Sequence, residues 1–172
     1  VGSMVGQLAK RAGARAVGVA GGADKCRYAT EELGFDACLD HRADDFAEQL
    51  RAACPDGVDV YFENVGLPVL RPVLPLLQPH ARIPLCGLVA HYNATALPEG
   101  PDRTVGLLNT VLKKKLRLQG FIIADHFDEF GTFAKQVAPA VLDGSIRFRE
   151  DVVSGLEQAP GAFIGMLKGE NF

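Results

Sequence analysis

Short apolar runs alternate with amphipathic stretches along most of the chain, and this alternation restricts its fold more than any other feature. Strands are expected over residues 15–20, 37–39, 58–63, 82–86 and 116–123. Helices are expected over residues 3–13, 24–33, 44–54, 104–115, 126–142 and 155–168, with a short or kinked helix in the proline-containing stretch 67–78. Short apolar strands separated by helices are typical of βαβ units, in which a parallel sheet is covered on both faces. The pattern predicts an α/β fold with a doubly wound parallel sheet of the Rossmann type.

The first ten residues indicate the second half of a glycine-rich turn that runs into a helix. Gly2 lets a backbone or a ligand approach closely, and Ser3 offers a hydroxyl and a backbone N–H at the helix start. Free N–H groups and the positive end of the helix dipole make such a start an anion site. Two glycines four residues apart also occur in ordinary packed helices, in which Gly6 would only let the helix lie close to a neighbouring strand.

The glycine-rich turn also bears on domain organisation. In the usual strand order 3-2-1-4-5-6, the strand before this turn is central, and here it would precede Val1. We therefore expect residues 1–172 to be one Rossmann domain of a longer protein, truncated at both ends and lacking its first strand.

Composition narrows the range of partners and compartments. A net charge of −3 gives no reason to expect nucleic acid or a membrane surface, and no apolar run approaches the ~18 residues of a membrane span. The four cysteines are scattered without a C-x-x-C pair, so reduced thiols in a cytoplasmic protein are expected rather than a disulfide framework. No Cys/His/Glu set has zinc spacing, and no metal site is predicted.

The residues after the expected strand at 15–20 indicate which cofactor the chain binds. An NAD-binding domain usually places a carboxylate there, but Gly21 and Gly22 occupy this position. Basic or titratable side chains follow at Lys25, Arg27, His41 and Arg42. Small residues leave room for a 2′-phosphate and cations bind it, so the site is interpreted as one for NADP. The alternative is that these side chains are solvated surface charges.

Asn64 ends the strand at 58–63, where its amide would be placed to hydrogen-bond the ribose of a nicotinamide. An asparagine at this point can equally form a turn in the left-handed conformation, and the two roles are compatible. Glu63 has no visible partner in the sequence, so it is interpreted as a structural residue or as one that supports a neighbouring residue of the site.

The next strand ends at Cys86, so the backbone of residues 86–89 is expected to pass close to the nicotinamide. Residues 88–103 form an unusually long loop without periodicity, which favours a functional role. Tyr92 in this loop is the only obvious proton donor within reach of a substrate, although a loop tyrosine can also serve packing. His91 has the same ambiguity.

Five runs of sequence occur in a specific order, at residues 1–10, 20–26, 32–36, 61–66 and 166–172. Together they resemble the zinc-independent medium-chain dehydrogenase/reductases, in the branch of the prostaglandin, curcumin and alkenal reductases, over essentially the whole chain. The resemblance implies NADPH-dependent reduction of the C=C bond of α,β-unsaturated ketones or aldehydes. It also implies a GroES-like catalytic domain upstream of this chain, and a homodimer.

The resemblance assigns roles to individual residues. It places the pyrophosphate at Gly2 and Ser3, the 2′-phosphate at Lys25 and His41, and the nicotinamide ribose at Asn64. The nicotinamide side would be lined by Cys86, Gly87, Leu88 and the stretch up to Tyr92, by Phe121, Ile122 and Ile123, and by Asn171. Tyr92 matches the tyrosine that assists the enone carbonyl or protonates the enolate. His41 stands where well-known members have tyrosine, which would make that contact sensitive to pH.

Three other functions remain open from the sequence. A quinone oxidoreductase of the same superfamily would differ only in its substrate. A non-catalytic NADP-binding or redox-sensing module would bind the cofactor without turnover. A methyltransferase-like Rossmann domain would bind S-adenosylmethionine instead.

Overall fold

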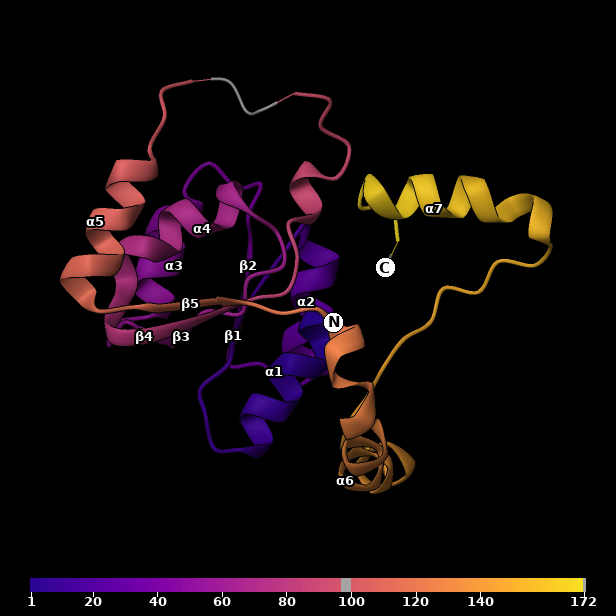
Figure 1. Ribbon diagram of the computed structural model, residues 1–172. Coiled ribbons are helices and arrows are strands. Elements are labelled where there is room, and N and C mark those ends of the chain that lie inside the picture. The colour runs from indigo at the N-terminus through magenta and orange to yellow at the C-terminus, as the bar shows by residue number, and fades with distance from the viewer. Residues whose placement is uncertain (97–99, 172) are drawn as a thin grey trace.

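The computed structural model describes residues 1–96 and 100–171, and within them five parallel strands form two sheets (Figure 1). In the first sheet, β1 (Val17–Ala20) pairs with β2 (Ala37–Asp40) in a continuous register from Val17↔Ala37 to Ala20↔Asp40. The second has the order β3-β4-β5, formed by β3 (Val58–Val60), β4 (Leu77–Leu85) and β5 (Arg117–Gly120).

The two sheets are separate because β1 and β3 do not pair with each other. Within the described part of the chain, β1 pairs only with β2, and β3 pairs only with β4. A doubly wound sheet has its central strand at this point. The arrangement confirms the predicted parallel α/β class, and within the described residues the edges of β1 and β3 that face away from β2 and β4 pair with no strand.

Helices flank the strands on both sides (Figure 1). The α-helices are α1 (Gly2–Arg11), α2 (Ala23–Glu31), α3 (Phe46–Ala53), α4 (Leu67–Val73), α5 (Thr104–Lys114), α6 (Phe130–Leu142) and α7 (Ala159–Leu167). Shorter 3-10 turns are η1 (Leu74–Leu76), η2 (Val89–His91), η3 (Ile123–Glu129) and η4 (Leu156–Gln158). None of the helices in the described residues is long and apolar enough to cross a membrane.

Two apolar clusters hold these layers together. The larger one joins α3 and α4 to the sheets through buried residues that include Leu50, Val69 and Ile83. The smaller one joins α6 to α1, where Val137 and Ala140 pack with Ile146 against Met4 and Leu8. In Figure 1, α7 lies apart from the strands, and its residues are mostly exposed.

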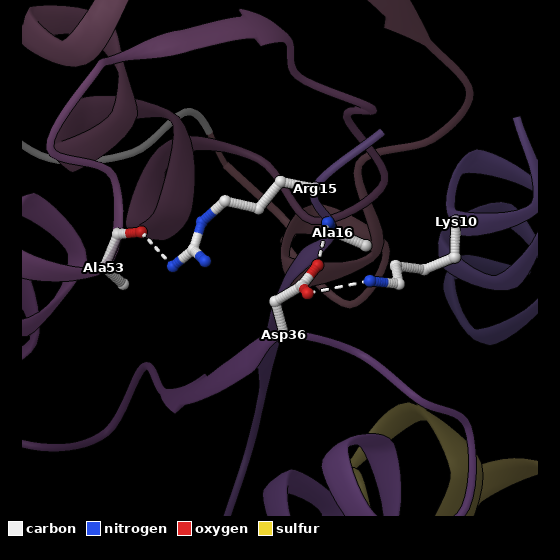
Figure 2. Close-up of polar contacts among 5 residues, drawn as sticks. All are labelled: Lys10, Arg15, Ala16, Asp36 and Ala53. Atoms are coloured by element: carbon white, nitrogen blue, oxygen red, sulfur yellow. Dashed lines mark hydrogen bonds and ion pairs between the residues drawn. The ribbon is translucent and has the colours of Figure 1, made fainter. Parts of the chain in front are cut away.

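Polar contacts fix the amino-terminal ends of β1 and β2 (Figure 2). Asp36 accepts hydrogen bonds from Lys10 Nζ and from the Ala16 N–H, each at 2.7 Å. These bonds, first that from Lys10 and then that from Ala16, hold the pKa of Asp36 below its usual value. Nearby, Arg15 donates to the carbonyl of Ala53 at the end of α3. The cluster lies at the sheet edge opposite the strand ends that carry the candidate site.

Strand β4 differs from the expectation, because it begins at Leu77 rather than at residue 82. Its pairing with β3 shifts between Val58↔Leu77 and Val60↔Arg82, so extra residues of β4 are accommodated there. The irregular stretch contains Pro79 and His80, and His80 has a φ of 68°. The bulge thus lets a strand pass through a proline that the sequence pattern interprets as a break.

The expectations after residue 86 also need adjustment. The expected strand 116–123 ends at Gly120, since its last partner in β4 is Leu85. The expected helix 126–142 begins at Phe130, because η3 precedes it with a kink at His126. The expected loop 88–103 contains the turn η2, and its residues 97–99 lie outside the described part of the chain.

Candidate cofactor site

The candidate residues follow the carboxyl-terminal ends of the strands. His41 follows β2, Asn64 lies beyond β3, Cys86 follows β4 and Phe121 follows β5. Parallel strands bring these ends to one edge of the sheet, which is where doubly wound folds bind their ligands.

The start of α1 has the features of an anion site. The N–H groups of Met4 and Val5 both donate to the carbonyl of Val1, so the amides of Gly2 and Ser3 precede the first helical hydrogen bonds. Apart from its chain neighbours and the backbone of its own helix, no heavy atom of the described residues lies within 4 Å of a Cβ placed on Gly2. The first turn contains no acidic residue, and its positive dipole end is therefore not neutralised from within the helix.

The turn between β1 and α2 is closed by Arg42 and Asp40. A Cβ on Gly21 would lie 3.1 Å from Arg42 Nε, so the guanidinium packs directly over this glycine. Gly22 has a φ of 98°, which favours glycine, and its amide hydrogen-bonds the Asp40 carboxylate. The Arg42 N–H also donates to Asp40, at 2.9 Å. These two bonds lower the pKa of Asp40.

Lys25 is held by the C-terminal turn of the chain. Its ammonium donates to the carbonyl of Gly169 at 2.9 Å, across 144 residues of sequence. Arg42 Nη2 lies 3.3 Å from a Cβ placed on the same glycine. The structure thus brings Lys25 and Arg42 together beside Gly169, two residues before Asn171. The adjacent His41 is half-buried, and its N–H donates to the carbonyl of Ala20.

At the other end of the site, Asn64 and Tyr92 converge on Gly87. A Cβ on Gly87 would lie 2.7 Å from Asn64 Oδ1 and 2.9 Å from Tyr92 Oη. The Leu88 N–H donates to the same tyrosine oxygen at 3.3 Å. Tyr92 is 61% exposed, so most of this side chain faces solvent. The structure therefore brings three of the predicted nicotinamide-side residues into contact.

The loops after β3 and β4 are joined by backbone hydrogen bonds. The N–H groups of Cys86 and Gly87 donate to the carbonyl of Glu63, and the Val89 N–H donates to the carbonyl of Asn64. These bonds align the loop that carries Asn64 with the loop that carries Gly87.

Glu63 is fully buried, with 0% of its surface exposed. Its Oε1 accepts hydrogen bonds from the N–H groups of Val65 (2.7 Å) and Gly66 (2.9 Å). The nearby Tyr61 hydroxyl has a raised pKa, chiefly because it is buried and also because Glu63 lies beside it. Across residues 1–96 and 100–171, neither Tyr61 Oη nor Glu63 Oε2 meets the geometry of a hydrogen bond.

The remaining predicted residues lie beyond β5. The ring of Phe121 packs edge-on against Phe62 and against His126, with centroid distances of 6.3 Å in both cases. Ile122 and Ile123 are 65% and 67% exposed and form part of an open apolar surface. In the described residues, no group of three or more His, Cys, Asp or Glu side chains is placed to hold a metal ion.

Sequence reasoning did not assign two of these contacts. It named Arg42 only as a nearby cation, and the pairing of a glycine after β1 with an arginine after β2 was the available signal. Glu63 was interpreted as structural or as supporting a site residue, but the backbone amides that its carboxylate binds cannot be identified from a residue pattern.

The chain is similar to several known proteins. Residues 1–139 match the family described as zinc-binding dehydrogenase. The chain is 60% identical over 173 residues to the NADPH-dependent curcumin reductase of Escherichia coli (strain K12), covering 100% of this chain and 50% of that protein. It is 40% identical over 174 residues to prostaglandin reductase 1 of Oryctolagus cuniculus, covering 99% of this chain and 48% of that protein.

A solved structure is similar over the whole described fold. The crystal structure of CurA in complex with NADPH from Vibrio vulnificus matches with a TM-score of 0.96 and 54% identity, over 100% of this chain and 51% of that one. The chain thus spans about half the length of the curated relatives it matches.

Proposed function

Since the chain belongs to the zinc-binding dehydrogenase family of medium-chain dehydrogenase/reductases, in the branch of the curcumin and prostaglandin reductases, we propose that the whole protein reduces the C=C bond of α,β-unsaturated ketones or aldehydes with NADPH. This chain is the cofactor-binding part. The observation that carries the proposal is the convergence of Asn64 Oδ1 and Tyr92 Oη on Gly87 at the carboxyl edge of the sheet.

The residues present fit NADPH along the whole site. Gly2 and Ser3 offer free amides and open space for the pyrophosphate. Lys25, with His41 and Arg42 near it, offers positive charge for the 2′-phosphate, and Gly22 has no heavy atom within 4 Å of a Cβ position. Asn64 would bind the nicotinamide ribose, beside Cys86, Gly87 and Leu88.

When bound, NADPH supplies the hydride that is transferred to the β-carbon of the enone. Tyr92 then donates a hydrogen bond to the substrate oxygen, on which negative charge develops, and so stabilises the enolate. A proton taken up from solvent at the α-carbon converts the enolate into the saturated carbonyl compound. Because Tyr92 stabilises the negative charge on the substrate oxygen, we propose that the reaction proceeds without zinc.

The rest of the protein completes the site and covers the open apolar surface. We propose a GroES-like catalytic domain upstream, with a strand that pairs between β1 and β3. We also propose a homodimer, because β5 is an exposed edge strand and is followed by the exposed Ile122 and Ile123. The four cysteines are free thiols, which supports a cytoplasmic location.

The test is turnover by the whole protein. NADPH oxidation, followed at its nicotinamide absorbance, should depend on an added enone such as an alkenal and yield the saturated carbonyl compound. A panel of quinones distinguishes the proposed enone reductase from a quinone oxidoreductase. The latter would oxidise NADPH with quinones and leave enones unchanged. Cofactor binding without any turnover would contradict the proposed enzyme.

A further inference from the structure

Glu63 is a buried acidic residue that the proposed reaction does not use. It sits between two loops of the cofactor site, directly before Asn64 and beside the loop that carries Gly87. An unpaired buried carboxylate is costly, so a fully buried glutamate needs compensating contacts. Those contacts are backbone amides of the Asn64 turn itself.

The side chain and the backbone of Glu63 act on different loops. Its Oε1 binds the N–H groups of Val65 and Gly66, which closes the turn immediately after Asn64. Its carbonyl accepts from Cys86 (2.9 Å) and Gly87 (3.3 Å), and its N–H donates to the carbonyl of Pro84. One residue therefore fixes the turn of Asn64 relative to the end of β4.

Resting on the proposed function, in which Asn64 binds the nicotinamide ribose, we infer that Glu63 is a positioning residue that orients Asn64 through the amides of Val65 and Gly66. Asn64 Oδ1 lies 2.7 Å from the Cβ position of Gly87, so a small rotation of the turn would move the amide into the glycine or away from it. Ligand-binding side chains need this kind of support to hold their geometry.

What matters is an acceptor at the Oε1 position, and the negative charge itself is not required. A glutamine has the same shape and can place its carbonyl oxygen at Oε1. Its NH₂ group would then occupy the place of Oε2, beside the Tyr61 hydroxyl, which can accept a hydrogen bond. A leucine has similar bulk but offers no acceptor to the two amides.

The test compares Glu63→Gln and Glu63→Leu in the whole protein, with NADPH affinity measured by calorimetry. We expect Glu63→Leu to weaken NADPH binding about five- to tenfold, as for the loss of one or two ligand hydrogen bonds, and Glu63→Gln to stay within about twofold of wild type. In an Asn64→Ala background, Glu63→Leu should have almost no further effect, since the residue through which it acts is gone.

Asp36→Leu is the matched control. Asp36 also accepts two N–H donors, but at the opposite edge of the sheet, so its loss should lower Tm and leave NADPH affinity unchanged. Equal NADPH affinity of folded Glu63→Leu and wild type would overturn the inference. Loss in Glu63→Gln as large as in Glu63→Leu would overturn it too.

A measurement on the wild type keeps the inference testable if Glu63→Leu does not fold. The amides of Val65 and Gly66 should exchange slowly with solvent, both with and without NADPH, and rapid exchange would contradict the orienting role. Because affinity is the readout, the result does not depend on enone reduction. Tight NADPH binding with no enone turnover would refute the proposed reaction. The NADPH affinities of Glu63→Leu and Glu63→Gln would still decide whether Glu63 positions Asn64.

Discussion

The ring of Phe35 fills the space that Gly6 leaves on α1, and a Cβ placed on Gly6 would overlap this ring. The same ring also lies 2.8 Å from a Cβ placed on Gly18 of β1, so it is held between the two glycines and has little room to move aside. Gly6 therefore does allow a close approach, but the neighbour is the aromatic ring that precedes β2 and not, as predicted, a strand.

Gly6→Ala should destabilise the whole protein by ~1–3 kcal/mol, the usual cost of overpacking a filled site. Chemical denaturation followed by circular dichroism would measure the change. Gly106→Ala is the control, because Gly106 is also in a helix but has no heavy atom within 4 Å of its Cβ position. It should be neutral or stabilise by up to ~1 kcal/mol. Similar losses in both variants would show that Phe35 accommodates the methyl group.

Lys25→Ala should weaken NADPH binding about tenfold and leave NADH binding almost unchanged, as for the loss of one charge-assisted contact with the 2′-phosphate. Calorimetric titration of the whole protein with both cofactors measures the ratio. Arg27→Ala is the control on the same helix, because Arg27 is exposed and paired with Asp24. Equal losses of affinity for NADPH and NADH would show that Lys25 acts only through its hydrogen bond to Gly169 and does not bind the 2′-phosphate.

Tyr92→Phe should lower kcat more than it raises KM, because the hydrogen bond to the substrate oxygen strengthens as charge develops in the transition state. The largest decrease in kcat that we expect is about 10²–10³-fold, which is roughly the effect of removing one hydrogen-bond donor from an oxyanion hole. The ring and its packing are retained, so NADPH affinity should not change. A change in KM alone would make Tyr92 a binding or packing residue.

Much of this site could be predicted from residue patterns, because strand ends meet at one edge whatever the details of packing. The convergence of Asn64, Gly87 and Tyr92 follows from this rule, and each residue was named from its position after a strand. The bridging contacts could not be predicted in this way. Lys25 binds a carbonyl 144 residues away, and Glu63 binds backbone amides, which are the same for every residue type.

The strands, too, could be predicted only in part: their existence followed from the sequence, but their limits did not. The existence of β4 and β5 was predicted, but the early start of β4 depends on a register shift opposite Val58 and Val60. The early end of β5 depends on where its partner strand β4 stops, at Leu85. Pairing with a neighbour determines both limits, and local propensity does not contain that information.

The Asp36 cluster predicts a dependence of stability on pH. The pKa of Asp36 is lowered in the folded state, chiefly by the hydrogen bond from Lys10, so the carboxylate stabilises the fold above its usual pKa of 3.8. This contribution should be lost as the pH falls from about 3.8 through the lower folded-state pKa. Asp36→Asn should therefore be less stable than wild type at pH 7, and the difference should shrink below pH 3.8. A difference independent of pH in urea unfolding would contradict this.

The open inner edges of β1 and β3 lead to a prediction about the chain by itself. Each edge belongs to a parallel sheet and, within the described residues, has no strand beside it, and β1 and β3 are at most half-buried there. Parallel strands buried on both faces need partners for their backbone groups, and each unpaired buried group costs on the order of 1–3 kcal/mol. Domains of this size are stable by only ~5–15 kcal/mol in total, so a few such losses, at the edge groups that packing buries, would remove most of that stability.

Residues 1–172 expressed alone should therefore show no cooperative thermal transition by circular dichroism or calorimetry. They should also fail to reduce enones, since the catalytic half of the pocket is proposed to lie in the GroES-like domain. Restoring the central strand, by extending the chain upstream, should restore a cooperative transition before any activity appears. A sharp transition of residues 1–172 together with NADPH-dependent enone reduction would contradict both expectations, because the two sheets would then be stable without a strand between β1 and β3.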